Sequence, residues 1–334
     1  MSDTLSDVLR AVRLTGGVFF AVDASAPWVA ETPDGSALGP HLMFGAEHVI
    51  DYHLVTHGSC WGGLLDEPPV RLEAGDVIVF PQGDAHTISS APGMRGNPEL
   101  GVRSLQGQSQ LPVSLSIQGG GPERAEIVCG FLGCDARPFN PLLATLPRVI
   151  HLRGGSESDS VLRHLIALAV AESHTPKSGS ECVLSKVSEL LFVEVVRRYV
   201  AALPPEKVGW LAGLRDENIG RALHKLHERP AHPWSLESLA KEVGMSRSML
   251  AERFMHFVGI PPIQYLAQWR IQLAASLLRS SKASLAEIAE RVGYGSEAAL
   301  SRAFKRCLGI APAGYRRGER ALVLEPPTLP HTRT

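Results

Sequence analysis

Histidine and carboxylate side chains that could bind a metal or a small molecule gather in the first third of the chain. A strand through residues 49–57 would place Asp51 and His53 on the same face, because alternate residues of a strand share a side. A divalent cation accepts such a mixture of imidazole and carboxylate ligands, so Asp51, His53 and the later His86 form a candidate metal site. The alternatives are polar groups that line a small-molecule pocket, or histidines whose hydrogen bonds are satisfied in the core.

The cysteines offer a second kind of chemistry. On a continuous strand, Cys129 and Cys134 would lie about 16 Å apart on opposite faces, too far for a disulfide, unless the glycines between them fold the segment back. They are a candidate redox pair, and buried free cysteine is the alternative for both and for Cys60, because a thiol sensor needs an exposed thiol of low pKa. The five cysteines are scattered and lack paired metal spacing, which favours a reducing, cytoplasmic location.

Residues 1–150 are expected to hold these side chains on a β-rich domain, because short apolar stretches such as GVFFAV and HVIDYHLV alternate with Gly, Pro and Asp clusters. The stretch GDVIVFPQGDAH, from Gly75 to His86, resembles the second signature motif of cupin barrels, in which the histidine points into the barrel and often binds a metal. The first cupin motif is incomplete, since Gly45 and Glu47 replace its histidine pair, although Asp51 falls at the place of its carboxylate. We therefore expect an effector pocket that contains Asp51, His53, Cys60 and His86.

Residues 151–215 change to helical periodicity. Leu184, Val187, Leu191 and Val195 recur at helical spacing, and the segment Val183–Val200 is apolar over most of its circumference. Such a helix has more apolar surface than one contact requires, so one side is expected on the barrel and another on a second copy of the chain. This predicts a homodimer; the alternative is a helix buried within its own domain.

One pattern occurs twice in the C-terminal region, at residues 235–265 and 284–315. Each copy has a serine cap, an apolar helix, a glycine stop at Gly244 or Gly293, and a second helix. Ser284 and Glu287 form a complete capping box in the second copy, whereas Ser238 stands at the place of the glutamate in the first. Helix, tight glycine turn and helix together predict a helix-turn-helix in each copy.

This pair of units, joined by a helix from Pro262 to about Arg279, resembles the DNA-binding domain of the AraC/XylS family of transcription regulators over about residues 216–317. A cupin-like front joined by helices to this back is also the usual architecture of the family. The resemblance implies double-stranded promoter DNA as one partner and a small molecule or an oxidant as effector. It also implies base contacts at seven positions, namely Ser248, Ala251, Glu252, Ala298, Ala299, Ser301 and Arg302.

Within that set, Arg302 is the strongest candidate, because a guanidinium can pair bidentately with guanine. Glu252 departs from the basic or amide residue expected at its position, and would accept from cytosine or face away. The joining helix is about 27 Å long, whereas major-groove faces recur at about 34 Å, so we expect bent DNA or one unit that binds less firmly. Phosphate contacts are expected at Arg247, Arg253, Lys305, Arg306, Arg316 and Arg317.

The charge distribution agrees with a sensing domain at the front of the chain and a DNA-binding domain at its back. Residues 1–215 carry 16 Lys and Arg against 23 Asp and Glu, whereas residues 216–320 carry 16 against 10, which suggests an anionic polymer as partner of the back half. No apolar run reaches the roughly twenty residues that span a membrane, so no membrane partner is expected. The expected architecture is an α+β multidomain chain with a cupin-like β-barrel for effector sensing (1–150), a helical dimerisation or linker segment (151–215), an all-α tandem helix-turn-helix domain (216–320) and a flexible tail (321–334).

The sequence therefore predicts a sequence-specific transcription regulator rather than an enzyme, with no cofactor except the candidate divalent metal in the barrel. A signal in the barrel would have to favour one arrangement of the chain over another. One alternative is a metal-dependent cupin enzyme fused to a DNA-binding domain. Another is a DNA-binding dimer whose barrel has no sensing role.

Overall fold

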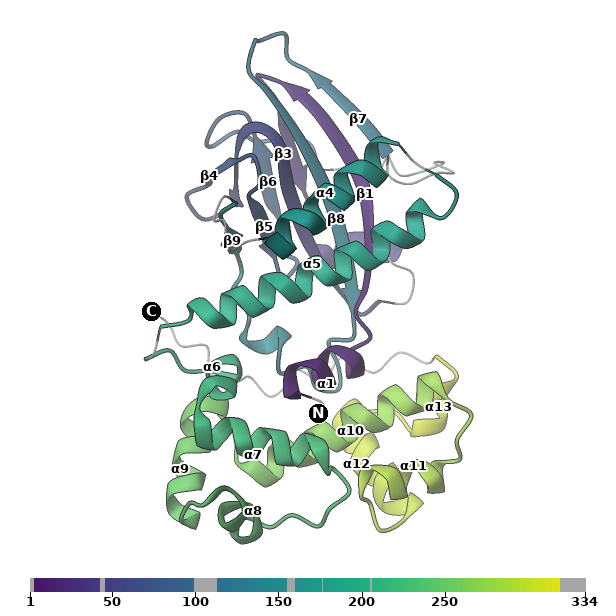
Figure 1. Ribbon diagram of the computed structural model, residues 1–334. Helices are drawn as coiled ribbons and strands as arrows, with labels where there is room; N and C mark the ends of the chain where they lie inside the picture. The colour runs from purple at the N-terminus through teal and green to yellow at the C-terminus, as the bar shows by residue number, and fades with distance from the viewer. Residues whose placement is uncertain are drawn as a thin grey trace. The chain divides into compact units, whose positions relative to one another are not determined.

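The computed structural model describes residues 3–42, 46–98, 113–154, 160–175, 177–204 and 206–318 (Figure 1). The chain divides into two compact units, which we call the barrel unit and the helical unit. The barrel unit comprises Leu14–Cys134 and Leu146–Ala202, and the helical unit comprises Met1–Arg13, Asp135–Thr145 and Leu203–Thr334. Two short segments of the expected barrel domain, residues 1–13 and 135–145, thus belong to the helical unit. The expected tail, 321–334, lies outside the described residues.

A curled sheet forms the barrel unit and confirms the cupin-like expectation for the front of the chain. Its strands follow the order β2-β6-β3-β8-β1-β7, while β4 and β5 also pair with β3, and β9 pairs with β5. The long strand β3 bends, pairing with β5 and β8 in its first half and with β4 and β6 in its second. The strands are β1 (Thr15–Ser25), β2 (Val29–Thr32), β3 (His48–Leu64), β4 (Val70–Glu73), β5 (Val77–Phe80), β6 (His86–Ser89), β7 (Val113–Gln118), β8 (Arg124–Cys134) and β9 (Ile150–Leu152).

The two faces of β3 have different surroundings. Tyr52 points to the outer face, where its hydroxyl lies 2.6 Å from Ser188 Oγ, and Gly130 of β8 leaves room for the Tyr52 ring because a Cβ there would lie 2.3 Å from it. Asp51 and His53 have the opposite parity and share the inner face with the core residues Val49 and Val55. The expected common face of Asp51 and His53 is therefore confirmed.

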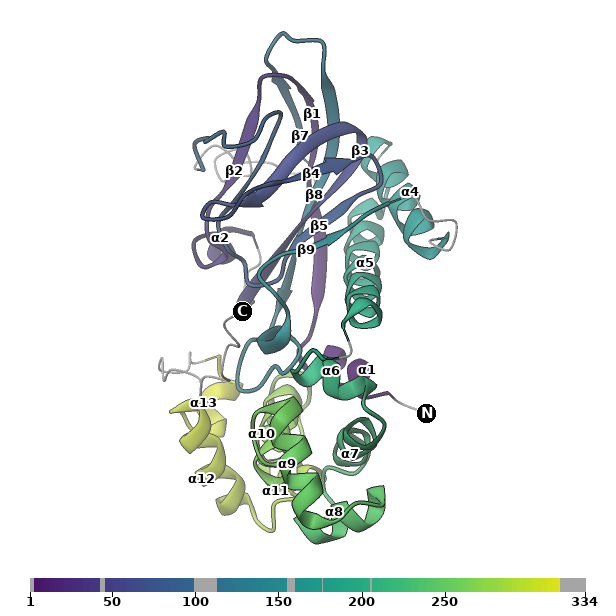
Figure 2. The same ribbon diagram turned by 90° about the vertical axis from the view of Figure 1, so that its left-hand side faces the viewer.

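Three helices complete the barrel unit: α2 (Gly35–Leu42), α4 (Ser160–His174) and α5 (Ser180–Ala202). Helix α5 packs against β1, and α4 packs against α5 (Figure 1 and Figure 2). The side of α5 that faces the sheet carries Leu184, Val187, Leu191 and Val195, all buried. This is the apolar set that the helical spacing identified.

The helical unit contains two helix-turn-helix units in series and a few additional elements. Among the described residues, no helix is long and apolar enough to cross a membrane. The N-terminal helix α1 packs on α7 and α10. The elements are α1 (Thr4–Ala11), the 3-10 turn η1 (Leu143–Thr145), α6 (Trp210–Arg215), α7 (Glu217–Glu228), α8 (Leu236–Val243), α9 (Arg247–Val258), α10 (Pro262–Ser280), α11 (Leu285–Val292), α12 (Glu297–Leu308) and α13 (Pro312–Arg316).

Candidate functional site

Local signals define the first helix-turn-helix, formed by α8 and α9. The hydroxyl of Ser235 caps α8, and the Ser238 hydroxyl accepts from the Ser235 backbone N–H at 2.9 Å, which completes a capping box without a glutamate. Gly244 ends α8 in the left-handed conformation, at φ 73°. Ser246 then caps α9, so the turn occupies only a few residues. The capping box of the first copy is therefore complete, with Ser238 in place of the glutamate.

The second helix-turn-helix, formed by α11 and α12, repeats this construction. Ser284 and Glu287 form the expected capping box, with Glu287 Oε2 accepting from the Ser284 N–H at 2.7 Å. Gly293 ends α11 at φ 86°, and Ser296 caps α12. The 19-residue helix α10 joins the two units, and the rings of Tyr265 and Tyr315 close them, each edge-on to a core phenylalanine.

The second helix of each helix-turn-helix buries one apolar face and exposes its opposite face to solvent. In α9 the buried residues are Leu250, Phe254 and Val258, and in α12 they are Leu300, Phe304 and Leu308. The expected base-contacting residues lie on the remaining surface: Ser248, Glu252, Ala298 and Arg302 are exposed, while Ala251, Ala299 and Ser301 are half-buried. The expected base-contacting positions of each second helix are therefore polar or small and at least partly exposed, as a helix that enters a groove requires, and α9 also exposes Met249 and Met255.

The expected phosphate-contacting side chains differ in their freedom. Arg253 forms an ion pair with Asp216, with Nε 3.2 Å from Oδ2, and its guanidinium lies over the Phe257 ring. Arg316 donates to the Ala283 carbonyl. The Lys305 side chain is exposed, and its ammonium group has no hydrogen bond or ion pair with any residue that the structure describes. Arg247, Arg306 and Arg317 are exposed as well.

Inside the barrel, the structure brings two of the expected residues into contact. His53 Nε2 lies 2.7 Å from His86 Nε2, and the His86 ring stacks on Phe80 at 3.8 Å. Burial lowers the pKa of His86 to about 4, although its Nδ1 donates to the Asp84 carbonyl, and burial together with the neighbouring His86 lowers the pKa of His53. Both imidazoles are therefore neutral near pH 7.

Asp51 is fully buried beside this pair. Neither carboxyl oxygen has a hydrogen-bond partner among the described residues, nor does His53 Nδ1. Burial, and to a smaller extent Asp34, raises the pKa of Asp51 well above its usual value, so the carboxyl group is held in the neutral form.

A metal ion fits this arrangement poorly. Because His86 Nδ1 donates to the Asp84 carbonyl, Nε2 of the neutral His86 ring accepts a hydrogen bond from His53 Nε2–H, and its lone pair is not free. Within the described ranges, no group of three or more His, Cys, Asp or Glu side chains is placed to hold a metal ion. The expected metal set of Asp51, His53 and His86 is thus not assembled, and the three remain buried polar residues of the barrel interior.

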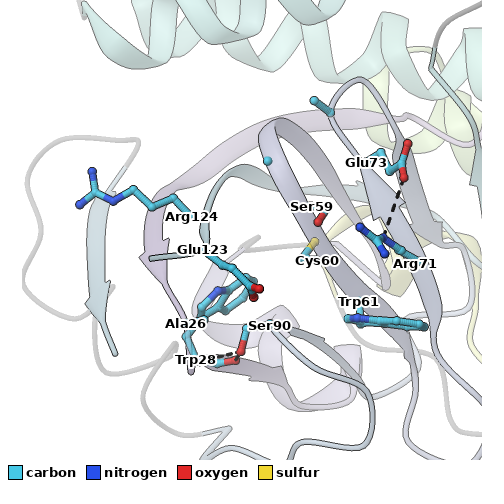
Figure 3. A pocket seen from close by; sticks show the side chains of 12 residues that line it. Ala26, Trp28, Ser59, Cys60, Trp61, Arg71, Glu73, Ser90, Glu123 and Arg124 are labelled. Atoms are coloured by element: carbon cyan, nitrogen blue, oxygen red, sulfur yellow. Dashed lines mark hydrogen bonds and ion pairs between the residues drawn. The ribbon is translucent and has the colours of Figure 1, made fainter. Parts of the chain in front are cut away.

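A pocket of about 710 Å³ opens elsewhere in the barrel unit (Figure 3). Of the residues expected in an effector pocket, Cys60 lines it, whereas Asp51, His53 and His86 do not. The indole rings of Trp28 and Trp61 lie on different sides of the pocket, and Ser59 and Cys60 lie between them in the view of Figure 3. The other lining residues are Ala26, Gly58, Arg71, Glu73, Ala74, Ser90, Glu123 and Arg124.

These tryptophans could not be recognised from the sequence because they belong to no motif. The only available signal was that Gly, Pro and Ser residues flank Trp28 and Trp61 in the sequence. The lining combines the two indole rings with two serines, two glutamates and two arginines, so it is more polar than most small-molecule sites, and its volume falls in the range of such sites.

The candidate redox cysteines lie on one continuous strand, β8, which pairs with β1 and β3 along its length. Cys129 and Cys134 are therefore five positions apart on opposite faces, and a disulfide between them does not fit. Burial raises the pKa of Cys129, and burial followed by Asp76 raises the pKa of Cys60 to about 12. These thiols are protonated near pH 7, which makes them weak nucleophiles.

Comparisons with known proteins agree with both units. A family described as Cupin matches residues 3–201, and a family described as Helix-turn-helix domain matches residues 239–318. An AraC-like transcription regulator of Streptomyces antibioticus is 32% identical over 320 residues, which cover 94% of this chain and 98% of that protein. The RCS-specific HTH-type transcriptional activator RclR of Escherichia coli is 29% identical over 282 residues, or 83% of this chain and 88% of that one.

Among solved structures, the DNA-binding domain of the global transcriptional factor AdpA in complex with a target DNA shares 33% identity and a TM-score of 0.30. The matched region covers 31% of this chain and 93% of the AdpA domain. The tandem helix-turn-helix, the curled sheet and the near full-length match to the Streptomyces protein lead to one assignment. The chain belongs to the AraC family of transcription regulators and carries a cupin-like N-terminal domain.

Proposed function

We propose that the barrel unit binds a small molecule or responds to a reactive species, and that this changes the affinity of the tandem helix-turn-helix for promoter DNA. The observation that carries the proposal is the pocket lined by Trp28 and Trp61, since its volume of about 710 Å³ is that of a small-ligand site. The relative RclR is named as an RCS-specific transcriptional activator, which supports a specific signal as the input of this chain too. The high pKa of Cys60 favours a bound ligand over direct thiol chemistry at that residue.

The test uses the full-length chain and a duplex that the wild-type protein selects from a random-sequence pool. Its affinity for that duplex is measured with a library of small aromatic and polar metabolites, and separately with hypochlorite. We expect one compound to change the affinity, Trp61→Ala to abolish that change, and Trp61→Phe to retain part of it. If neither a compound nor hypochlorite alters the affinity, or if Trp61→Ala and Cys60→Ser respond as the wild type does, the proposal is wrong.

For DNA reading, we propose that α9 and α12 enter successive major grooves through the seven exposed or half-buried positions named above. Arg302 supports this best, because its side chain is exposed on the open face of α12 and has no hydrogen bond or ion pair with any described residue. Helix α10 has 19 residues and is therefore about 28 Å long, shorter than the roughly 34 Å between groove faces, so bound DNA is expected to bend.

We also propose that the protein is a homodimer through α4 and α5. Large apolar side chains are exposed on both helices at heptad separation, namely Val161 (54%) and Leu168 (42%) on α4, and Val183 (37%) and Leu190 (54%) on α5. Large apolar side chains that stay exposed on two packed helices are typical of an association surface. Sedimentation of the Leu190→Lys variant should give a lower mass than the wild type, and an unchanged mass would contradict this interface.

A further inference from the structure

A buried glutamine lies in the middle of α10, the helix that joins the two helix-turn-helix units. Gln272 is 1% exposed, yet both ends of its amide are used. Its Nε2 donates to the Ala11 carbonyl at 3.0 Å, and its Oε1 accepts from the Phe139 backbone N–H at 3.0 Å. A buried amide that satisfies two backbone groups at once ties the end of α1 and the segment 135–145 to α10, because losing it would leave both groups unpaired.

A buried carboxylate makes a second connection to the same helix. Asp135 is 3% exposed and accepts from Arg13 Nε and Nη2, each at 2.7 Å, and from Arg279 Nη1 at 2.7 Å. Arg279 lies near the end of α10, and its guanidinium is 4.2 Å from the ring centre of Tyr315, which closes the second helix-turn-helix. Hydrogen-bonded ion pairs of this kind hold their partners in a defined geometry.

The segment 135–145 also reaches the first helix-turn-helix. The Phe139 ring packs edge-on against Tyr265, at 5.2 Å between ring centres. Tyr265 in turn accepts from Trp210 Nε1 at 2.8 Å and lies 2.7 Å from His227 Nε2, so it is the centre of the buried network of that unit. Residues 135–145 therefore contact the closing tyrosine of one unit directly and that of the other through Arg279.

These contacts lie at the ends of two barrel strands. Asp135 directly follows Cys134, the last residue of β8, and Arg13 is two residues before Thr15, the first of β1. The strands β1 and β8 are neighbours, with Thr15 opposite Gly133, and the Asp135 N–H donates to the Val12 carbonyl at 2.8 Å. The chain therefore passes from β1 and β8 directly into the segments that hold α10.

We propose that Gln272 and Asp135 form a latch through which strands β1 and β8 are coupled to α10 and hence to DNA binding. The proposal rests on the proposed function and names its route of regulation. Both latch residues are positioning residues: they hold α10, and with it the closing tyrosines of the two units. Coupling of this kind is reciprocal, so DNA bound at the helix-turn-helix units must also act on the barrel strands.

That reciprocity supplies a test without an effector. Hydrogen–deuterium exchange of the full-length chain is compared with and without the duplex selected by the wild-type protein. In the wild type, the duplex should change the exchange of residues 4–13, 135–145 and the adjoining ends of β1 and β8. Gln272→Leu should still bind the duplex but lose the change in β1 and β8. The matched control is Gln264→Leu, an exposed position on the same helix, which should behave as the wild type.

The Asp135→Asn variant keeps the test decisive if Gln272→Leu does not fold. It should also lose the response of β1 and β8, whereas Asp23→Asn, an equal change of charge at an exposed residue of β1, should keep it. A saturated wild-type complex with unchanged exchange in β1 and β8, or latch variants that respond as the wild type does, overturns the latch. If the proposed sensing fails and the latch is correct, the result is different. No compound or oxidant would alter the affinity for the duplex, but the latch variants would still lose the change in hydrogen–deuterium exchange of β1 and β8.

Discussion

The two helix-turn-helix units share a buried framework and differ on the surface. Leu239, Ala240 and Val243 of α8 correspond to Ile288, Ala289 and Val292 of α11, and all six are buried. A phenylalanine in each second helix packs against a closing tyrosine in the same edge-on manner. The exposed residues follow no such correspondence: Glu252 and the paired Arg253 on α9 contrast with Arg302, Lys305 and Arg306 on α12.

This difference separates the residues that specify the fold from those that we propose select DNA. The buried set tolerates only conservative change, because packing and close helix crossing depend on its volume. The exposed set carries no folding constraint of that kind. We therefore expect α12 to contribute more of the affinity and α9 to contribute less, and the following variants sharpen or break that expectation.

The largest difference between the two helix-turn-helix units is expected in the stability lost when alanine replaces the glycine of each turn. Gly244 and Gly293 both have positive φ, so alanine should cost about 1–2 kcal/mol of unfolding free energy at either position. At Gly293 the new Cβ would also lie 2.6 Å from Ala231 Cα, a backbone atom, which adds about 1–3 kcal/mol, whereas nothing lies within 4 Å at Gly244. Urea unfolding of the full chain should therefore show a larger fall in midpoint for Gly293→Ala than for Gly244→Ala.

Gly295→Ala is the control for this pair, because its position is open and its φ is not in the left-handed region. It should leave the unfolding midpoint near that of the wild type. Equal midpoints for Gly244→Ala and Gly293→Ala would show that the turn of the second unit is no more constrained than that of the first.

The turns could be predicted from the sequence because their signals are local. Ser235, Gly244, Ser284 and Gly293 lie within a few residues of the helix ends that they define, and capping and positive φ depend on residue type. The same holds for the alternation of β3, which correctly placed Asp51 and His53 on one face. Ser238 shows the limit of a motif, since its hydroxyl performs the glutamate's role in the capping box.

Contacts between distant segments could not be predicted in this way. Gln272 bonds to a carbonyl 261 residues away, and nothing in the helical pattern of α10 distinguishes it from an exposed glutamine. The pocket shows the same limit, because Trp28, Trp61 and Arg124 meet only after the sheet curls. The motif-based choice of His53 and His86 found buried polar residues of the barrel rather than the lining of that pocket.

The next effect in size is expected at Arg302. The Arg302→Ala variant should lose about 1–3 kcal/mol of binding free energy for the selected duplex and discriminate less at one base position, because the proposed bidentate contact to guanine would be removed. Equilibrium binding to single-base variants of the duplex measures both effects. Arg291→Ala removes the same charge from exposed α11 and should cost less. Full affinity and unchanged discrimination in Arg302→Ala would show that α12 does not read the DNA through this side chain.

The smallest expected effect is a change in the salt dependence of DNA binding, which should differ between the unpaired Lys305 side chain and the paired Arg253. Lys305 has no partner in the described part of the chain, so Lys305→Ala should reduce the slope of log affinity against log salt by about 0.9, as expected for one lost phosphate contact. Arg253→Ala should change that slope less, because Asp216 already neutralises the guanidinium. Equal losses of slope in the two variants would mean that Arg253 leaves Asp216 when DNA binds.

The Asp216→Asn variant tests the same difference between Lys305 and Arg253 by removing the partner of Arg253 rather than Arg253 itself. Asp216 also caps α7 by accepting from the backbone N–H groups of Asn218 and Ile219, and asparagine is an equally good cap, so the fold should be retained. Without the carboxylate, the charge of Arg253 is no longer neutralised by Asp216, and the salt slope should rise by up to about 0.9. A slope unchanged from that of the wild type would place Arg253 away from the phosphates even when it is free, and the weaker contribution of α9 would then follow from its geometry rather than from this ion pair.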